Sequence, residues 1–123
     1  MEDTDFLEAL SGVYYIATTD GDQPHVRPFD GLIKIDEKYF MTSNSSKKVF
    51  QQIKKNPKIE IFSMERGMVR FTAEAYPVED KELTETVHDA LGKDMTDDSV
   101  AIEVKNIKGS LTTIMGESFM LNL

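Results

Sequence analysis

The residues best suited to chemistry in this sequence form a short basic segment that follows a run of hydroxyl and amide side chains. The first two lysines of the segment come directly after Thr42-Ser43-Asn44-Ser45-Ser46 and open a stretch with apolar residues at helical spacing. Backbone N–H groups, the positive end of a helix dipole, hydroxyls and ammonium groups then converge, which predicts a phosphate site. Segment 44–58 contains no acid and five lysines, Lys47, Lys48, Lys54, Lys55 and Lys58.

Arg27 is a second candidate for phosphate binding. It lies between Val26 and Pro28 in a predicted strand, where a charged side chain should face a pocket or solvent. The strand–loop–helix unit with the lysines can lie beside this strand, and a guanidinium can hold a phosphate at two points. The alternative is that the lysines form only a solvated helix face.

The composition excludes several classes of site. The chain has 123 residues and a net charge of -8, so binding to nucleic acid or to an anionic membrane is not expected. The absence of cysteine excludes disulfides, thiolate metal sites and cysteine nucleophiles. The two histidines, His25 and His88, lie far apart in the sequence, so no metal site is expected, and we expect His88 to be a solvated helix residue. The seven methionines are expected to fill the core.

The N-terminal residues and the hydropathy of the chain indicate where in the cell the protein is expected. Residues 1–5 are acidic and lack the basic, apolar and small-residue succession of a signal peptide. No apolar run approaches the roughly 20 residues that a membrane helix needs. The sequence therefore predicts a cytoplasmic protein.

The elements that must position these residues are mainly strands. Three helices are expected, over 5–10, 47–55 and 80–91. The strands are expected at 13–19, 23–35, 39–43, 58–64, 68–78, 100–107 and 111–121, with Lys108-Gly109-Ser110 as the turn between the last two. Pro28 inside the second strand indicates a bulge or an edge there. Six or seven antiparallel strands with helices between them predict a mainly β fold, a closed or partly closed barrel in one domain over 1–123.

Several segments, taken in order and with their spacing, resemble a known family. They are similar to the pyridoxamine 5′-phosphate oxidase-like flavin-binding split barrels. The segments are Ala17-Thr18-Thr19-Asp20-Gly21, Pro24-His25-Val26-Arg27-Pro28-Phe29, Tyr39-Phe40-Met41-Thr42-Ser43, Ser46-Lys47-Lys48-Val49, Asn56-Pro57-Lys58-Ile59 and Val69-Arg70-Phe71.

The resemblance implies a six-stranded antiparallel split barrel that forms a homodimer, with FMN in two clefts at the subunit interface. It also implies the roles of the residues around the flavin. Arg27, with Lys47 or Lys48, would hold the phosphate. Thr42 and Ser43 would donate hydrogen bonds near the phosphate and ring, Pro28 and Phe29 would place backbone groups along the ring edge, and Arg70 would reach in from the other subunit. An arginine on the outward face of its strand, opposite Val69, Phe71, Ala73 and Ala75, can equally be just solvated.

The sequence differs from the family's pattern at several points, and these differences limit which activities are expected. The chain is shorter than true pyridoxamine 5′-phosphate oxidases and has no tryptophan, so oxidation of pyridoxamine phosphate is not expected. A deazaflavin stays open as the cofactor, whereas the two histidines make haem a weaker choice. His25 can line the cleft or be a solvated edge residue. The expected function is an FMN-dependent oxidoreductase of unknown substrate. The alternatives are a flavin-binding electron carrier or sensor, and an interaction module that has lost the flavin.

Overall fold

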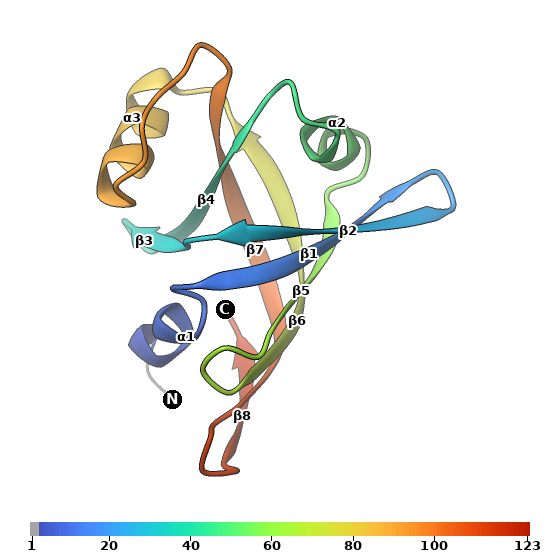
Figure 1. Cartoon of the computed structure of the whole chain (residues 1–123), viewed down its shortest axis with the longest axis vertical. Helices are drawn as coiled ribbons and strands as arrows, with labels where there is room; N and C mark the ends of the chain where they lie inside the picture. The colour runs from blue at the N-terminus through green and yellow to red at the C-terminus, as the bar shows by residue number, and fades with distance from the viewer. Residues whose placement is uncertain (1–2) are drawn as a thin grey trace.

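One curled antiparallel sheet with three flanking helices makes up the computed structural model, which describes residues 3–123 (Figure 1). The helices are α1 (Asp3–Ala9), α2 (Lys48–Lys55) and α3 (Lys81–Ala90). The strands are β1 (Val13–Asp20), β2 (Gln23–Asp30), β3 (Ile33–Ile35), β4 (Lys38–Asn44), β5 (Lys58–Ser63), β6 (Met68–Val78), β7 (Ser99–Thr112) and β8 (Ser118–Asn122). The prediction of a mainly β antiparallel fold is confirmed. No helix within this described range is long and apolar enough to cross a membrane.

The sheet is open, and its two ends lie close together in the chain. Its strand order is β2-β1-β5-β6-β7-β4-β3, and β8 pairs with β7 beyond the end of β4. Only Gly31 and Leu32 separate β2 from β3, so a single strand over 23–35 was a wrong prediction. The reason is Gly31, whose φ of +83° turns the chain out of β2 and across to the edge of β4. The two ends are thus joined by the chain and not by a ladder.

The longest strand, β7, crosses a position where the sequence predicts a turn. Lys108, Gly109 and Ser110 lie inside β7, where they pair with both β6 and β8, and the turn comes later, before β8. Gly109 is needed for close approach, because a Cβ there would lie 2.1 Å from the Arg70 carbonyl oxygen and 2.5 Å from the Phe71 Cα. A glycine that allows two strands to approach was therefore mistaken for a turn glycine. The sheet has eight strands where six or seven were expected, because the predicted strand over 23–35 is two strands, β2 and β3.

The core fills the concave side of the sheet, and α1 lies across its opening. Phe6 of α1 is fully buried, and its ring makes edge-to-face contacts with Tyr39 of β4 at 5.7 Å and Phe71 of β6 at 5.3 Å. Such aromatic pairs add stabilisation to the burial of their apolar area. Strands from both halves of the sheet are therefore held together by one helix.

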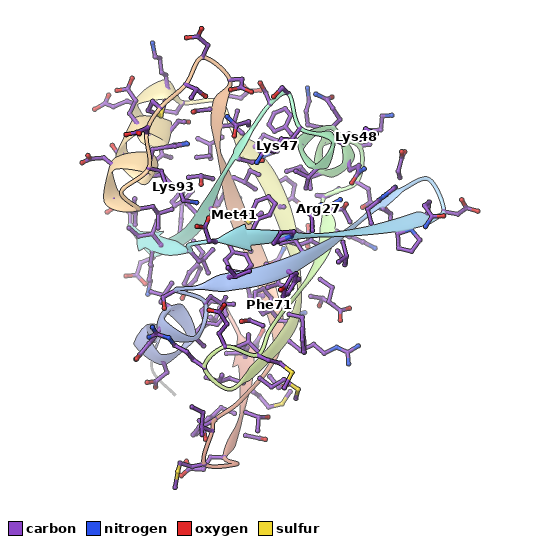
Figure 2. The ribbon with its side chains drawn as sticks, in the orientation of Figure 1. Arg27, Met41, Lys47, Lys48, Phe71 and Lys93 are labelled. Carbon is purple, nitrogen blue, oxygen red and sulfur yellow. The ribbon has the colours of Figure 1, made fainter. Side chains whose placement is uncertain are left out.

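The methionines do not fill the core as predicted. Met41, on β4, is the only fully buried methionine within residues 3–123 (Figure 2 labels it), and Met1 lies outside the described residues. The other methionines of this range lie at strand edges, in loops and on the outer sheet face, away from the core. The exposed ones are Met64, Met68, Met95, Met115 and Met120.

Replacing Gly109 by alanine should lower the stability of the fold. The added methyl group has to displace the backbone of β6, and overpacking of this kind costs about 1–3 kcal/mol. Urea unfolding followed by circular dichroism measures the change. Ser110→Ala, one residue further along β7, is the matched control and should change stability much less. Equal losses in the two variants would mean that Gly109 has no special role in the approach of the strands.

Candidate functional site

A cavity of about 310 Å³ lies where β2, at one end of the sheet, faces β4 near the other end. β2 and β4 form one side of it, and the start of α2 and the segment from α3 to β7 form the other. The lining residues are Pro28, Phe29, Asp30, Thr42, Ser43, Asn44, Lys47, His88, Lys93, Asp94, Thr96 and Ser99. Clefts for small ligands begin at about this size. Five of the predicted site residues thus line one cavity, Pro28, Phe29, Thr42, Ser43 and Lys47.

The start of α2 supplies donors at one end of the cavity. Lys47 occupies the N-cap position, and no side chain caps the free N–H groups of the first turn, which contains no acid. Unpaired N–H groups at a helix start attract anions. Lys47 lines the cavity, whereas Lys48, the other candidate, does not (Figure 2).

Ser43 and Thr42, at the end of β4, give the cavity a buried polar wall. Ser43 is only 6% exposed, and its hydroxyl has no hydrogen-bond partner within the described residues. A buried polar group without a partner is unfavourable, which indicates that Ser43 is positioned for a ligand. Thr42 is also buried, and its hydroxyl accepts a hydrogen bond from Lys93.

Lys93 joins the two sheet ends across the cavity. Its ammonium donates to the Asp30 carbonyl oxygen at 2.7 Å, to the Asp30 carboxylate at 2.9 Å and to the Thr42 hydroxyl at 2.8 Å. All three hydrogens of the ammonium are used. A residue just beyond α3 thereby connects β2 with β4, which no backbone ladder joins in residues 3–123.

Asp98 fixes the loop that precedes α2. Its carboxylate accepts hydrogen bonds from Ser46 at 2.5 Å and from Thr96 and Asn44 at 2.8 Å each. The Ser46 bond, followed by those from Thr96 and Asn44, holds the pKa of Asp98 well below its usual range. The Ser45 N–H also donates to the Asp98 carbonyl oxygen, at 2.8 Å. Side-chain and backbone bonds therefore hold the loop at the start of α2 in one conformation.

Arg27 lies below α2 and outside the lining of the cavity. Its guanidinium donates to Gln52 of α2 at 2.8 Å and to the Ile16 carbonyl oxygen at 3.1 Å. The buried Gln52 oxygen also accepts from Thr18, at 2.5 Å. Partial burial lowers the pKa of Arg27, which still stays charged near neutral pH. In this structure Arg27 connects β2 to α2.

Arg70 lies on the outer face of the sheet and not at the cavity of its own chain. It forms an exposed ion pair with Glu60, 2.9 Å between Nε and Oε1. By strand register it belongs to one row that crosses the outer face, formed by Pro28, Tyr15, Phe62, Arg70, Ser110 and Met120. We call this set the outer row; Pro28 at its end also lines the cavity.

The two histidines differ in their surroundings. His88 is only 3% exposed and lines the cavity, so the prediction of a solvated helix residue was wrong. Its position on the inner side of α3 follows from the packing of the preceding Val87 against Phe40 and Ala101. His25, on β2, is half-buried and does not line the cavity.

The residues that sequence reasoning missed come mainly from one segment, 88–99. Within that segment, His88, Lys93, Asp94, Thr96, Ser99 and Asp98 line or brace the cavity. The segment looked like a helix end and a polar loop, because no spacing in it shows that it folds back over β2 and β4. The Gly92 that ends α3 was the one available signal for such a turn.

The chain is similar to known proteins in both sequence and fold. The pyridoxamine 5′-phosphate oxidase family matches it over residues 3–114. The chain belongs to the pyridoxamine 5′-phosphate oxidase-like family. The resemblance found in the sequence and the split-barrel fold are therefore confirmed. The sheet of this split barrel is open and has eight strands. None of the curated proteins compared with the chain matches it.

Three solved structures illustrate the range of the family's fold. A NimC/NimA family protein from Clostridium acetobutylicum is 32% identical, with a TM-score of 0.82; the match covers 96% of this chain and 92% of that one. An FAD-binding protein from Mesorhizobium loti is 15% identical, with a TM-score of 0.62 and coverage of 85% and 89%. The haem storage protein HutZ from Vibrio cholerae is 18% identical, with a TM-score of 0.65 and coverage of 98% and 92%. The last two show the shared fold alone.

Asp98 should give this family member an acid-sensitive component of stability. The carboxylate has a lowered pKa in the folded state, so its contribution is present above the unfolded value of about 3.9 and is lost as the pH falls below it. Asp98→Asn should be less stable at neutral pH and should show a weaker loss between neutral pH and pH 3. Thermal unfolding as a function of pH measures both. Asp97→Asn, the neighbouring exposed acid, is the control; identical acid profiles for the Asp98 and Asp97 variants would contradict the role of the network.

Proposed function

We propose that the chain binds FMN in this cavity and acts as an oxidoreductase on a substrate still to be identified. The observation that carries the proposal is the buried Ser43 hydroxyl, which lacks a partner in a cavity that begins at the uncapped start of α2. Membership of the family supports a flavin or a related cofactor. FMN fits these residues because it combines a phosphate with a flat ring whose edge needs hydrogen-bond partners.

The phosphate belongs at the start of α2. Lys47 and the free N–H groups of the first helical turn are the donors on the cavity wall. We assign Arg27 to the same end of the site, where it supports α2 through Gln52 and brings a second positive charge. The Asp98 network holds the loop between β4 and α2, so the donors are ordered before a ligand arrives.

The flavin ring belongs between the ends of β2 and β4. Pro28 and Phe29 offer backbone groups there, and Ser43 offers an unpaired hydroxyl. When bound, FMN supplies the transfer of a hydride or of single electrons, while the protein binds and orients it. A flavin that carries the chemistry also explains why the sequence contains no acid–base pair at catalytic spacing. The cytoplasmic location stays a prediction.

Spectra and turnover separate this proposal from its alternatives. A yellow purified protein with flavin absorbance excludes an interaction module that has lost the flavin. A deazaflavin is distinguished from FMN by mass spectrometry of the released cofactor. Steady oxidation of a reduced nicotinamide in the presence of an acceptor favours an enzyme, whereas a flavin that is reduced once without turnover favours a carrier or sensor.

Lys47→Ala should weaken FMN binding about ten- to a hundredfold, because a charged hydrogen bond contributes roughly 1.5–3 kcal/mol. Binding of riboflavin, which has no phosphate, should change little. Lys48→Ala is the matched control, since Lys48 is the neighbouring lysine outside the cavity lining. Quenching of flavin fluorescence measures the affinities of the wild type and of both variants for the two ligands. Equal losses of affinity for FMN and riboflavin, or a larger loss from Lys48→Ala, would mean that Lys47 does not bind the phosphate and belongs only to a solvated helix face.

We also propose that the chain forms a homodimer through the outer row. The row is apolar for most of its length, and Tyr15 and Met120 are 46% and 82% exposed. Exposed apolar surface that spans several strands is typical of protein interfaces. Because Pro28 belongs to both the row and the cavity, a second copy on this face adds a wall to the cavity. The partner's Arg70 is then our candidate for a contact with the cofactor.

FMN should therefore suppress dissociation of the dimer, since a ligand held by both subunits stabilises only the associated state. Sedimentation at falling protein concentration, with and without FMN, tests this. Arg70→Ala should reduce the effect of FMN. Arg66→Ala is the matched control, because Arg66 is also exposed and also paired with one glutamate, Glu8, but lies off the outer row. A monomer with undiminished FMN affinity would place the whole site within one chain.

A further inference from the structure

One ring nitrogen of His88 has a partner on its own helix, and the other has none among residues 3–123. Its Nδ1 lies 2.8 Å from the Thr84 carbonyl oxygen. A carbonyl oxygen only accepts, so Nδ1 must carry a hydrogen and donate it. Nε2 has no hydrogen-bond partner among residues 3–123, although the side chain is buried and lines the cavity. The free nitrogen is therefore the one that a ligand can meet.

The ring is held in a fixed place by the helix that carries it. Val87 and Leu91 pack against the small apolar cluster around Phe40. The backbone N–H of Lys93 donates to the His88 carbonyl oxygen at 2.9 Å, and the Lys93 ammonium connects this end of α3 to β2 and β4. A group held in this way needs little reorganisation when a ligand arrives.

The charged groups around His88 come from β2, from the start of α2 and from the loop after α3. From β2 comes Asp30, which is paired with Lys93 from the loop. Lys47 at the start of α2 is assigned to the phosphate, and Asp94 remains as an exposed acid in the cavity lining. β4 and β7 contribute only uncharged side chains to this lining, Thr42, Ser43, Asn44 and Ser99, and on α3 itself Glu85 and Asp89 are exposed.

The same distribution of charge narrows the second ligand of the site. With Lys47 facing the phosphate and Lys93 paired with Asp30, the charge of Asp94 and that of a proton-carrying His88 ring cancel, which leaves the remaining space without net charge. A carboxylate or phosphate on the substrate would find no compensating charge there, so an uncharged acceptor is favoured. A flat acceptor can stack beside the flavin ring.

We propose that His88 is the proton-carrying residue of this site, and that the acceptor is an uncharged quinone-type carbonyl compound. The inference rests on the proposed function. The quinone takes a hydride, with both electrons, from the reduced flavin, and one proton from His88 Nε2; the hydroquinone leaves and the flavin is oxidised. Neutral His88 then recovers a proton from water, and a reduced nicotinamide returns a hydride to the flavin. Proton transfer of this kind contributes roughly a hundredfold or more to a rate.

The test separates the two halves of the reaction after FMN affinity has been measured. In stopped flow, flavin reduced with stoichiometric dithionite is mixed with benzoquinone. His88→Gln should slow reoxidation by benzoquinone about a hundredfold, and should change the reduction of the flavin by nicotinamide much less, once both rates are measured with the flavin site saturated. His25→Gln, the other histidine, should match the wild type. Added imidazole should restore part of the rate in His88→Ala, which a purely structural role would not allow.

A second readout needs no turnover. The chain has only two histidines, so a spectrum of the imidazole C–H groups contains two pairs of signals, one pair from each ring, and His25→Gln assigns them. The His88 signal should move on addition of FMN and again on addition of hydroquinone. This readout decides the matter if His88→Gln fails to fold. Unchanged reoxidation in a folded His88→Gln, or a His88 signal that ignores both ligands, overturns the inference and leaves flavin binding intact. Failure of the wild type to bind FMN overturns the proposed function as well.

Discussion

The site exists because the two ends of the sheet approach each other without pairing. β2 lies at one end of the strand order and β4 next to the other, yet Gly31 and Leu32 join these ends within two residues of chain. A fully closed barrel would fill the gap with ladder hydrogen bonds and side chains. Here the gap remains as the cavity lined by Pro28, Phe29, Thr42 and Ser43. The positive φ of Gly31 is therefore a requirement of the site as well as of the fold.

Polar side chains replace the missing ladder. Lys93 spans Asp30 and Thr42, Arg27 connects β2 with α2 through Gln52, and Asp98 ties the loop before α2 to the start of β7. These bonds order the donors around the cavity but leave its interior open, which a continuous backbone ladder could not do. Arg27, Lys93 and the loop before α2 are thus braced before any ligand binds. The unpaired Ser43 hydroxyl is the exception, because it is buried at an energetic cost that a hydrogen bond to a ligand would remove.

We call the part of the site formed by β2, β4 and α2 its floor, and the part formed by residues 88–99 its roof. The sequence predicts the floor of the site better than the roof. Strand and helix periodicity predicted a strand that ends near Thr42 and Ser43 and a helix that starts near Lys47, and the structure has both, because a strand followed directly by a helix with few intervening residues has little freedom. Gly109 was misread as a turn, since a glycine required for close strand approach looks the same in sequence as one required for a positive φ. His88, Lys93 and Asp98 could not be placed, because their positions depend on where 88–99 folds back over the sheet. The sequence could not decide between Lys47 and Lys48, because the direction of the start of α2 determines which of the two lysines lines the cavity.

This division between floor and roof has a consequence for specificity. The floor comes from β2, β4 and α2, which are also parts of the sheet and its packing, so changes there alter the fold. The roof residues come from one contiguous stretch between α3 and β7, held by polar bonds such as those of Lys93 and Asp98. A stretch of this kind can change its side chains with little effect on the sheet. The end of the cavity to which we assign the cofactor is therefore constrained by the architecture, while the roof residues, His88 and Asp94 among them, are set by a segment that the architecture leaves free to vary.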